Sequence, residues 1–174
     1  MKKLVVICLA LTILSTLSVK ALEIESPAFK NGEKIPEVYT CDGKDISPKL
    51  IFRQIPARAK TLVLIMDDPD APMGTWVHWV VYNIPVSVKE LQKDFPKKAL
   101  LSNGTIQGKN SWGKIGYGGP CPPKPTGEHR YFFKLYAIDT VLNLPQGATK
   151  QEVLKAIKEH IVAQAVLMGR YSRK

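Results

Sequence analysis

The sequence has few of the residues from which catalytic and metal sites are usually built, with three cysteines and three histidines in 174 residues. It has no HExxH and no GxSxG, which argues against a zinc peptidase helix and against the nucleophile turn of a serine hydrolase. It has no CxxC, so a thioredoxin-like redox role is unsupported. A phosphate-binding GxxxxGK[ST] loop is missing as well. We therefore predict no catalytic residue, no metal site and no cofactor.

Long apolar runs are also missing, with one exception at the N-terminus. A basic Met-Lys-Lys start precedes the mostly apolar residues 4–17, which have the length of a signal h-region and are too few for a transmembrane helix. Val19-Lys20-Ala21 then resembles a cleavage site. We predict a signal peptide over 1–21 and a single domain over 22–174, exported to the periplasm or secreted and without a transmembrane span. An uncleaved membrane anchor is the alternative.

The charge is strongly positive but dispersed. The formal net charge is +10, and removing the three lysines of residues 1–21 leaves +7. Such a domain is attracted to anionic surfaces. The basic residues form no stripe interleaved with aromatics, so we predict a solvated basic surface and no nucleic-acid partner.

Two cysteines remain after the predicted cleavage, Cys41 and Cys121. An exported protein meets an oxidising compartment, and an even cysteine count favours a disulfide. In the chain-entropy model a bridge closing about eighty residues contributes roughly 4 kcal/mol. Two separate buried thiols are the alternative.

The apolar segments are short, and prolines and glycines lie scattered between them, which predicts a mainly β protein. Three segments are typical of strands: residues 61–66 (TLVLIM), 75–84 (TWVHWVVYNI) and 129–138 (HRYFFKLYAI). In the second, alternation places His78 on the same face as Trp76, Val80 and Tyr82, half buried.

One helix is predicted near the C-terminus. Residues 149–152 (TKQE) form a capping box. The helical period then groups five residues on one face, with Ile161 as the last of them: Val153, Ala156, Ile157, His160 and Ile161. The segment AQAVLMGRY, residues 163–171, is a candidate for a final strand.

The segment DDPDAPMG, residues 67–74, connects the first two predicted strands. Pro69 and Pro72 restrict the backbone, so the carboxylates between them are held in fixed directions. Asp68 leaves one strand near the point where His78 enters the next, which can bring a carboxylate and an imidazole within reach of each other. An ordinary turn beside a core histidine remains an equal alternative from this segment alone.

A second segment favours a site. Residues 116–131 (GYGGPCPPKPTGEHRY) contain four glycines and four prolines and end in His129 and Tyr131 on one strand face. Glycines permit close approach of a ligand to backbone N–H groups. His78, His129 and Tyr131 can supply hydrogen bonds, and an aspartate can fix the histidine tautomers. We predict a small anion pocket.

These motifs, in this order, resemble the phosphatidylethanolamine-binding protein (PEBP) family: DPDAP, HWVVYNIP, GYGGPCPP and HRYFFKLYAID, with CDGKDISPKLIF earlier. The chain is similar in particular to the bacterial Raf-kinase-inhibitor-like branch. The resemblance implies an antiparallel β-sandwich with short C-terminal helix and strand elements. It also implies a pocket for a phosphate-like anion or phospholipid headgroup, a possible kinase or protease partner and a possible homodimer.

Matching the motifs residue by residue implies a ligand site of six residues: Asp68, Asp70, His78, Pro123, His129 and Tyr131. A Cys41–Cys121 bridge would brace the pocket loop. The function predicted is binding of a small anion or headgroup by an exported protein, with no chemistry. Two alternatives are a metal-dependent or acid/base hydrolase that uses the Asp/His cluster and an interaction protein with a vestigial pocket.

Overall fold

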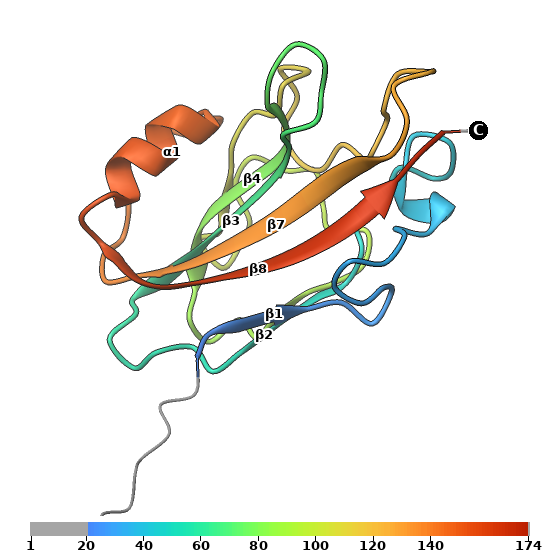
Figure 1. The fold of residues 1–174 in the computed structure, drawn as a ribbon. Coiled ribbons are helices and arrows are strands. Elements are labelled where there is room, and N and C mark those ends of the chain that lie inside the picture. Colours follow the sequence, from blue (N-terminus) through green and yellow to red (C-terminus); the bar gives the residue numbers. More distant parts are fainter. Residues whose placement is uncertain (1–20, 174) are drawn as a thin grey trace, which may run out of the picture.

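The computed structural model describes residues 21–173, so the predicted signal peptide lies outside the described residues except for its last residue, Ala21. The described chain forms two antiparallel β-sheets, one α-helix and one short 3-10 helix (Figure 1). Among these residues, no helix is long and apolar enough to cross a membrane. The prediction of a mainly β sandwich is confirmed.

The small sheet has the order β1-β2-β5 and the large sheet the order β6-β4-β3-β7-β8. The elements are, in chain order, β1 (Glu23–Glu25), η1 (Glu37–Tyr39), β2 (Leu50–Arg53), β3 (Thr61–Asp68), β4 (Trp76–Pro85), β5 (Glu90–Leu91), β6 (Ile106–Gln107), β7 (His129–Ile138), α1 (Lys150–Ile157) and β8 (Ile161–Tyr171).

Two apolar clusters cover the two faces of the large sheet. The main core lies between the sheets and contains alternate residues of the central strands, such as Leu64 of β3, Trp79 of β4 and Phe133 of β7. The second cluster packs Val63, Ile65 and their neighbours against α1. Because both faces of β3 are covered, all eight of its residues are buried, which explains its continuous apolar sequence.

The helix α1 begins at the predicted capping box. The Thr149 side chain accepts from the Glu152 backbone N–H, and the Glu152 carboxylate accepts in return from the Thr149 N–H. The prediction that its apolar face continues to Ile161 is wrong. The helix ends at Ile157, and Ile161 begins β8 opposite Ile138 of β7. Pairing with the ten-residue strand β7 satisfies the backbone hydrogen bonds of this segment, which begins with two β-branched residues.

A β-bulge in β4 changes the predicted direction of His78. Met66 pairs with Trp79 and Asp67 with Val77, so His78 is the extra residue between them. Val80 and Tyr82 face the helix side, whereas His78 packs on Tyr131 of the main core. The prediction that His78 shares a half-buried face with Trp76, Val80 and Tyr82 is therefore wrong for Val80 and Tyr82, and His78 is 2% exposed.

Candidate functional site

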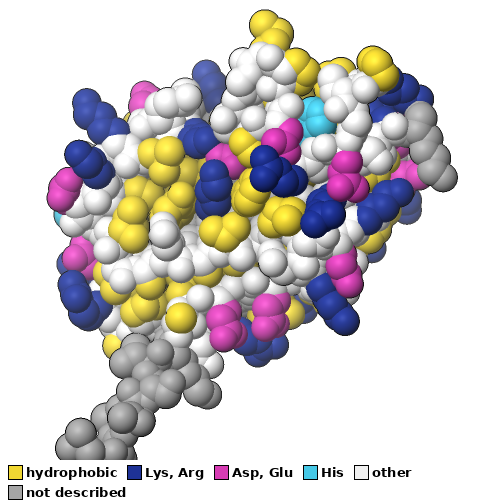
Figure 2. Space-filling model, viewed as in Figure 1, with side chains coloured by type: hydrophobic (Ala, Val, Ile, Leu, Met, Phe, Trp, Pro, Cys, Tyr) yellow, Lys and Arg dark blue, Asp and Glu magenta, His cyan; other side chains and the backbone are white. Residues whose placement is uncertain are grey.

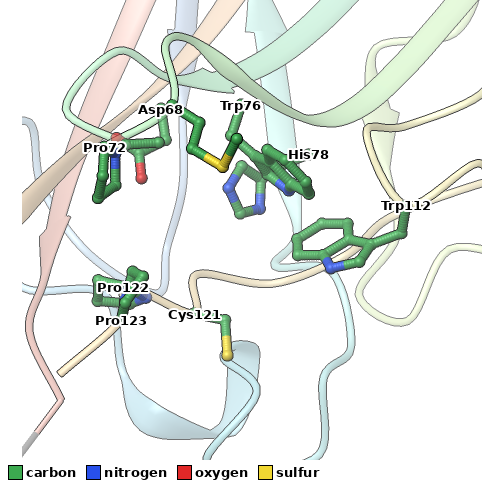
Figure 3. Close-up of a pocket in the computed structure, with 10 residues that line it drawn as sticks. Asp68, Pro72, Trp76, His78, Trp112, Cys121, Pro122 and Pro123 are labelled. Atoms are coloured by element: carbon green, nitrogen blue, oxygen red, sulfur yellow. The ribbon is translucent and has the colours of Figure 1, made fainter.

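A cavity of about 360 Å³ opens at one end of the large sheet, where the β3–β4 loop and the long loop before β7 lie together. Its lining consists of Asp68, Ala71, Pro72, Met73, Trp76, His78, Trp112, Cys121, Pro122 and Pro123. Figure 3 shows the His78 ring and the Trp112 indole on one side of the open space, with Pro122 and Pro123 across from them. Most of the wall is apolar, and only Asp68 and His78 bring ionisable side chains to it.

Asp68 lies at the end of β3 and is held from two directions. Its Oδ2 is 2.7 Å from His129 Nδ1, and its Oδ1 accepts a 2.8 Å hydrogen bond from the Asp70 backbone N–H. Only 3% of the residue is exposed. The predicted stiff Asp-Pro turn thus fixes a carboxylate at the cavity.

His129 supports Asp68 from behind and does not line the cavity. The Thr126 hydroxyl donates its one proton to the Pro123 carbonyl oxygen. In the 2.8 Å hydrogen bond between Thr126 Oγ1 and His129 Nε2, the donor is therefore the His129 N–H. His129 Nδ1 faces Asp68 Oδ2, so the two buried side chains hold each other in place.

His78 contributes a different group. Its Nδ1 lies 2.7 Å from the Gly118 carbonyl oxygen, which can only accept, so Nδ1 carries the proton and Nε2 a lone pair. Burial lowers the pKa of His78, although the Gly118 bond and nearby carboxylates oppose that shift. The imidazole is therefore neutral near pH 7 and presents an acceptor.

Tyr131 lies two residues after His129 on β7, on the same face of the strand. Its ring packs edge-on against His78, with the ring centroids 5.2 Å apart. Its hydroxyl is buried beside the Asp68 carboxylate. Burial, and then the Asp68 charge, raise the pKa of Tyr131, so the phenol keeps its proton. Tyr131 thus packs against His78 and does not line the cavity.

The remaining predicted site residues differ in placement. Pro123 lines the cavity as expected, whereas Asp70 does not. Asp70 instead accepts from Arg130, with 2.7 Å between Oδ1 and Nη2, and these bonds lower the pKa of its carboxyl to about 2. Asp70 thereby ties the β3–β4 loop to β7. Asp68 and His78, predicted to lie within reach of each other, both line the cavity, and the side-chain partner of Asp68 is His129.

The predicted disulfide is present and forms part of the site. Cys41 and Cys121 are bonded, and Cys121 is one of the cavity-lining residues. Next to it, the Gly119 N–H donates to the Asp45 carboxylate. The loop that carries Pro122 and Pro123 is thus attached to the segment around residues 41–45 by a covalent bond and a hydrogen bond.

Sequence reasoning missed the aromatic part of the wall. Trp112 packs on both Trp76 and His78, at 5.4 and 5.1 Å between ring centroids, and is 42% exposed. Its position in NSWGKIG, among small and polar loop residues, was the available signal. A tryptophan in such a segment has no strand face to fill and is suited to a binding surface.

The basic side chains on the drawn face form no continuous stripe. On the face drawn in Figure 2, the lysines and arginines are dispersed among acidic and apolar side chains. Within residues 21–173, no group of three or more His, Cys, Asp or Glu side chains is arranged to hold a metal ion. Asp68 and His78 are therefore considered below as hydrogen-bonding groups.

Comparison with known proteins gives consistent matches. The family model described as phosphatidylethanolamine-binding protein matches residues 25–172. A UPF0098 protein of Aquifex aeolicus is 54% identical over 153 residues, which cover 87% of this chain and 89% of that protein. One from Methanothermobacter thermautotrophicus is 48% identical over 152 residues, with 87% and 99% covered.

Two crystal structures have the same architecture. The structure of a PEBP homologue from Chlamydia trachomatis has a TM-score of 0.80 at 43% identity and covers 88% of this chain and 99% of its own. Escherichia coli YbcL, described as a new member of the mammalian PEBP family, has a TM-score of 0.82 at 30% identity, with 89% and 100% covered.

Proposed function

This chain belongs to the phosphatidylethanolamine-binding protein family, and from that premise we propose that it is an exported binding protein whose cavity takes a small phosphate-bearing ligand, such as a headgroup. The observation that carries the proposal is the cavity itself. Fixed polar groups, Asp68 and His78, meet at the floor of an otherwise apolar pocket of about 360 Å³. This combination is typical of small-ligand sites.

The polar groups match the parts of such a ligand. His78 has a lone pair for a ligand O–H or N–H group, and Asp68 brings a carboxylate to the cavity wall. Trp76, Trp112 and the prolines provide apolar contact for its carbon atoms. Each of these groups acts by binding, and none needs to transfer a proton or form a bond.

Export is supported by two separate features. The residues 1–21 have the pattern of a signal peptide, and the disulfide between Cys41 and Cys121 suits an oxidising compartment. A basic domain outside the cytoplasm meets anionic lipid surfaces and free phosphate compounds alike. The surface for a kinase or protease partner would be the same end of the molecule, where Met73 is 94% exposed at the cavity rim.

The test is an NMR titration of the purified protein with phosphoethanolamine. We expect saturable shifts at Trp76, His78, Trp112 and Cys121 and their loss in a His78→Ala variant. His160→Ala is the matched control, because His160 is a half-exposed histidine paired with Asp139 away from the cavity. Shifts that persist in His78→Ala, or no saturable shifts in the wild type, would refute the proposed site.

A further inference from the structure

The outer edge of strand β8 is covered over only part of its length. β8 is the last strand of the large sheet, with β7 on its inner side (Figure 1). Near its C-terminal end, the carbonyl oxygens of Met168 and Arg170 accept backbone N–H groups from residues 31–35 on the outer side. Over residues 161–167, β8 has no such outer backbone partner within the part of the chain that the structure describes. This stretch is a free sheet edge.

The backbone of the free stretch offers hydrogen bonds to a further strand. Outward-pointing backbone groups alternate along a sheet edge, and the pairing with β7 is regular from Ala163 onward. Because Met168 points outward, Gln164 and Val166 do so too. Natural edge strands are usually protected by charges, proline or shortness. Residues 161–167 contain no charge and no proline, and β8 is 11 residues long.

The side chains along this edge are apolar and partly open to solvent. Ile161 is 42% exposed and Val166 is 50% exposed. Next to Val166, a hollow of about 320 Å³ lies between the edge strands of the two sheets, where Ile24 of β1, Phe29 and Leu167 of β8 line it. A strand added to β8 would therefore remove apolar surface from water as well as extend the sheet.

We propose that the free edge binds a second copy of this chain, with the two β8 strands antiparallel across a two-fold axis at Gln164. Residues 162–166 read Val-Ala-Gln-Ala-Val, which is the same in both directions. An antiparallel pair centred on Gln164 places valine opposite valine, alanine opposite alanine and glutamine opposite glutamine, as a two-fold contact requires. The free stretch, 161–167, has the same midpoint. The pairing would therefore end where residues 31–35 already occupy the edge.

The groups brought together satisfy one another. Two opposite residues whose backbone groups point at each other exchange two N–H···O=C bonds, and the two Gln164 residues would form such a pair. The Gln164 side chain is exposed and carries both donors and an acceptor, so it can also bond its copy. The β-bulge at Val162 lies at the end of the stretch and leaves the central pairs regular.

Charge permits this contact between two identical basic molecules. The chain has a formal net charge of +10, yet residues 161–169 contain no charged side chain. Like charges directly opposite each other would destabilise a symmetric pair of strands, and this stretch brings none together. A stretch without either sign offers no ion pair to a charged partner, so a neutral strand that matches itself fits it best.

The pairing would leave both ligand cavities open. The cavity lies at the end of the sheet where β8 finishes, with Tyr171 opposite His129. A two-fold axis at Gln164 reverses the strand direction, so the partner's cavity would lie at the opposite end of the joined sheet. This inference therefore does not depend on the proposed ligand, and failure of either proposal leaves the other standing.

The experiment is sedimentation equilibrium of the purified protein over a concentration series, with charged variants at the proposed axis. The wild type should reach twice the protomer mass at high concentration. Gln164→Lys and Gln164→Glu each place like charges opposite each other, so each should raise the dissociation constant of the dimer at least about tenfold. An equimolar mixture of the two variants should restore the dimer, because lysine then faces glutamate.

A matched control and a second readout complete the test. Gln151 is also an exposed glutamine but lies on α1, so Gln151→Lys should leave the dissociation constant unchanged. Amide hydrogen exchange needs no variant. The Gln164 and Val166 amides of the wild type should be protected at high concentration, and their protection should fall on dilution.

Three results would overturn the inference. The first is a protomer mass at every concentration, with fast exchange of the Gln164 and Val166 amides. The second is a dimer that Gln164→Lys leaves intact, or that the mixture fails to restore, because the contact would then lie elsewhere. The third is slow exchange of both amides in a monomer, which would assign the free edge to another segment of the same chain.

Discussion

His129 lies directly behind Asp68, with Nδ1 2.7 Å from Oδ2, and each residue is almost fully buried. The carboxylate is therefore fixed by protein groups before any ligand arrives. A preorganised acceptor avoids the ordering cost that a flexible surface aspartate would incur on binding.

The pH dependence of the free energy of unfolding should report the lowered pKa of His78. Its pKa is about 6.5 when unfolded and is lowered by burial in the fold, so the unfolded chain binds more protons below pH 6.5. The free energy of unfolding should consequently fall as pH decreases from about 7 to 5. Urea titrations should show a smaller fall for His78→Gln than for the wild type. His160→Gln controls for loss of a histidine, and identical slopes for wild type and His78→Gln would contradict this account.

Removing the disulfide with Cys41→Ala and Cys121→Ala together should lower the free energy of unfolding by about 2–5 kcal/mol. Affinity for phosphoethanolamine should fall too, because Cys121 and the adjacent Pro122 and Pro123 line the cavity. Wild-type protein unfolded under reducing conditions is the control and should match the variant. Unchanged affinity would show that hydrogen bonds alone hold this loop.

Gly119→Ala should displace the loop before β7 through a steric clash. A methyl group at Gly119 would meet the Tyr39 carbonyl oxygen and the Thr40 Cα, which are backbone atoms fixed by the fold. We expect a loss of about 1–3 kcal/mol in stability and weaker ligand binding. Gly118→Ala is the comparison, since its methyl would meet the Trp112 side chain, which is partly exposed and can move. An equal or larger loss in Gly118→Ala would contradict this reading of the loop.

Asp67→Asn tests the separation of the two faces of the sheet. Asp67 is buried and pairs with Lys134 of β7 and Lys150 of α1, both of which reach solvent. Loss of the carboxylate should cost about 1–3 kcal/mol of stability in chemical unfolding. Ligand affinity, measured by the same titration as above, should stay within about twofold, because Asp67 lies on the helix side. A large loss of affinity in a folded variant would argue against the assigned cavity.

The main strands were predictable because their sequences are unambiguous. Both faces of β3 are covered, so TLVLIM is continuous, and β7 alternates buried and partly exposed residues along its length. The end of the helix was not predictable from period alone. Ile161 fits either a helical face or a strand, and pairing with Ile138 across the sheet determines the outcome.

The site was predictable to the level of its segments but not of its contacts. Asp68, His78 and Pro123 line the cavity, as the motifs suggested. A bulge of one residue reverses the side to which His78 points, and nothing local in TWVHWVV marks it. The partner of Asp68 is 61 residues away on a strand that comes from a different hairpin, so only the sheet order β4-β3-β7 reveals it.

The last strand closes the large sheet beside the site. Strand β8 pairs along the whole length of β7, from His129 opposite Tyr171 to Ile138 opposite Ile161, and the Tyr171 hydroxyl bonds Asp42 beside the disulfide. Because β8 is the edge strand of this sheet, the strand that carries His129 and Tyr131 has no other outer neighbour among the described residues. A chain shortened before residue 161 would therefore leave the edge of β7 unpaired next to the cavity.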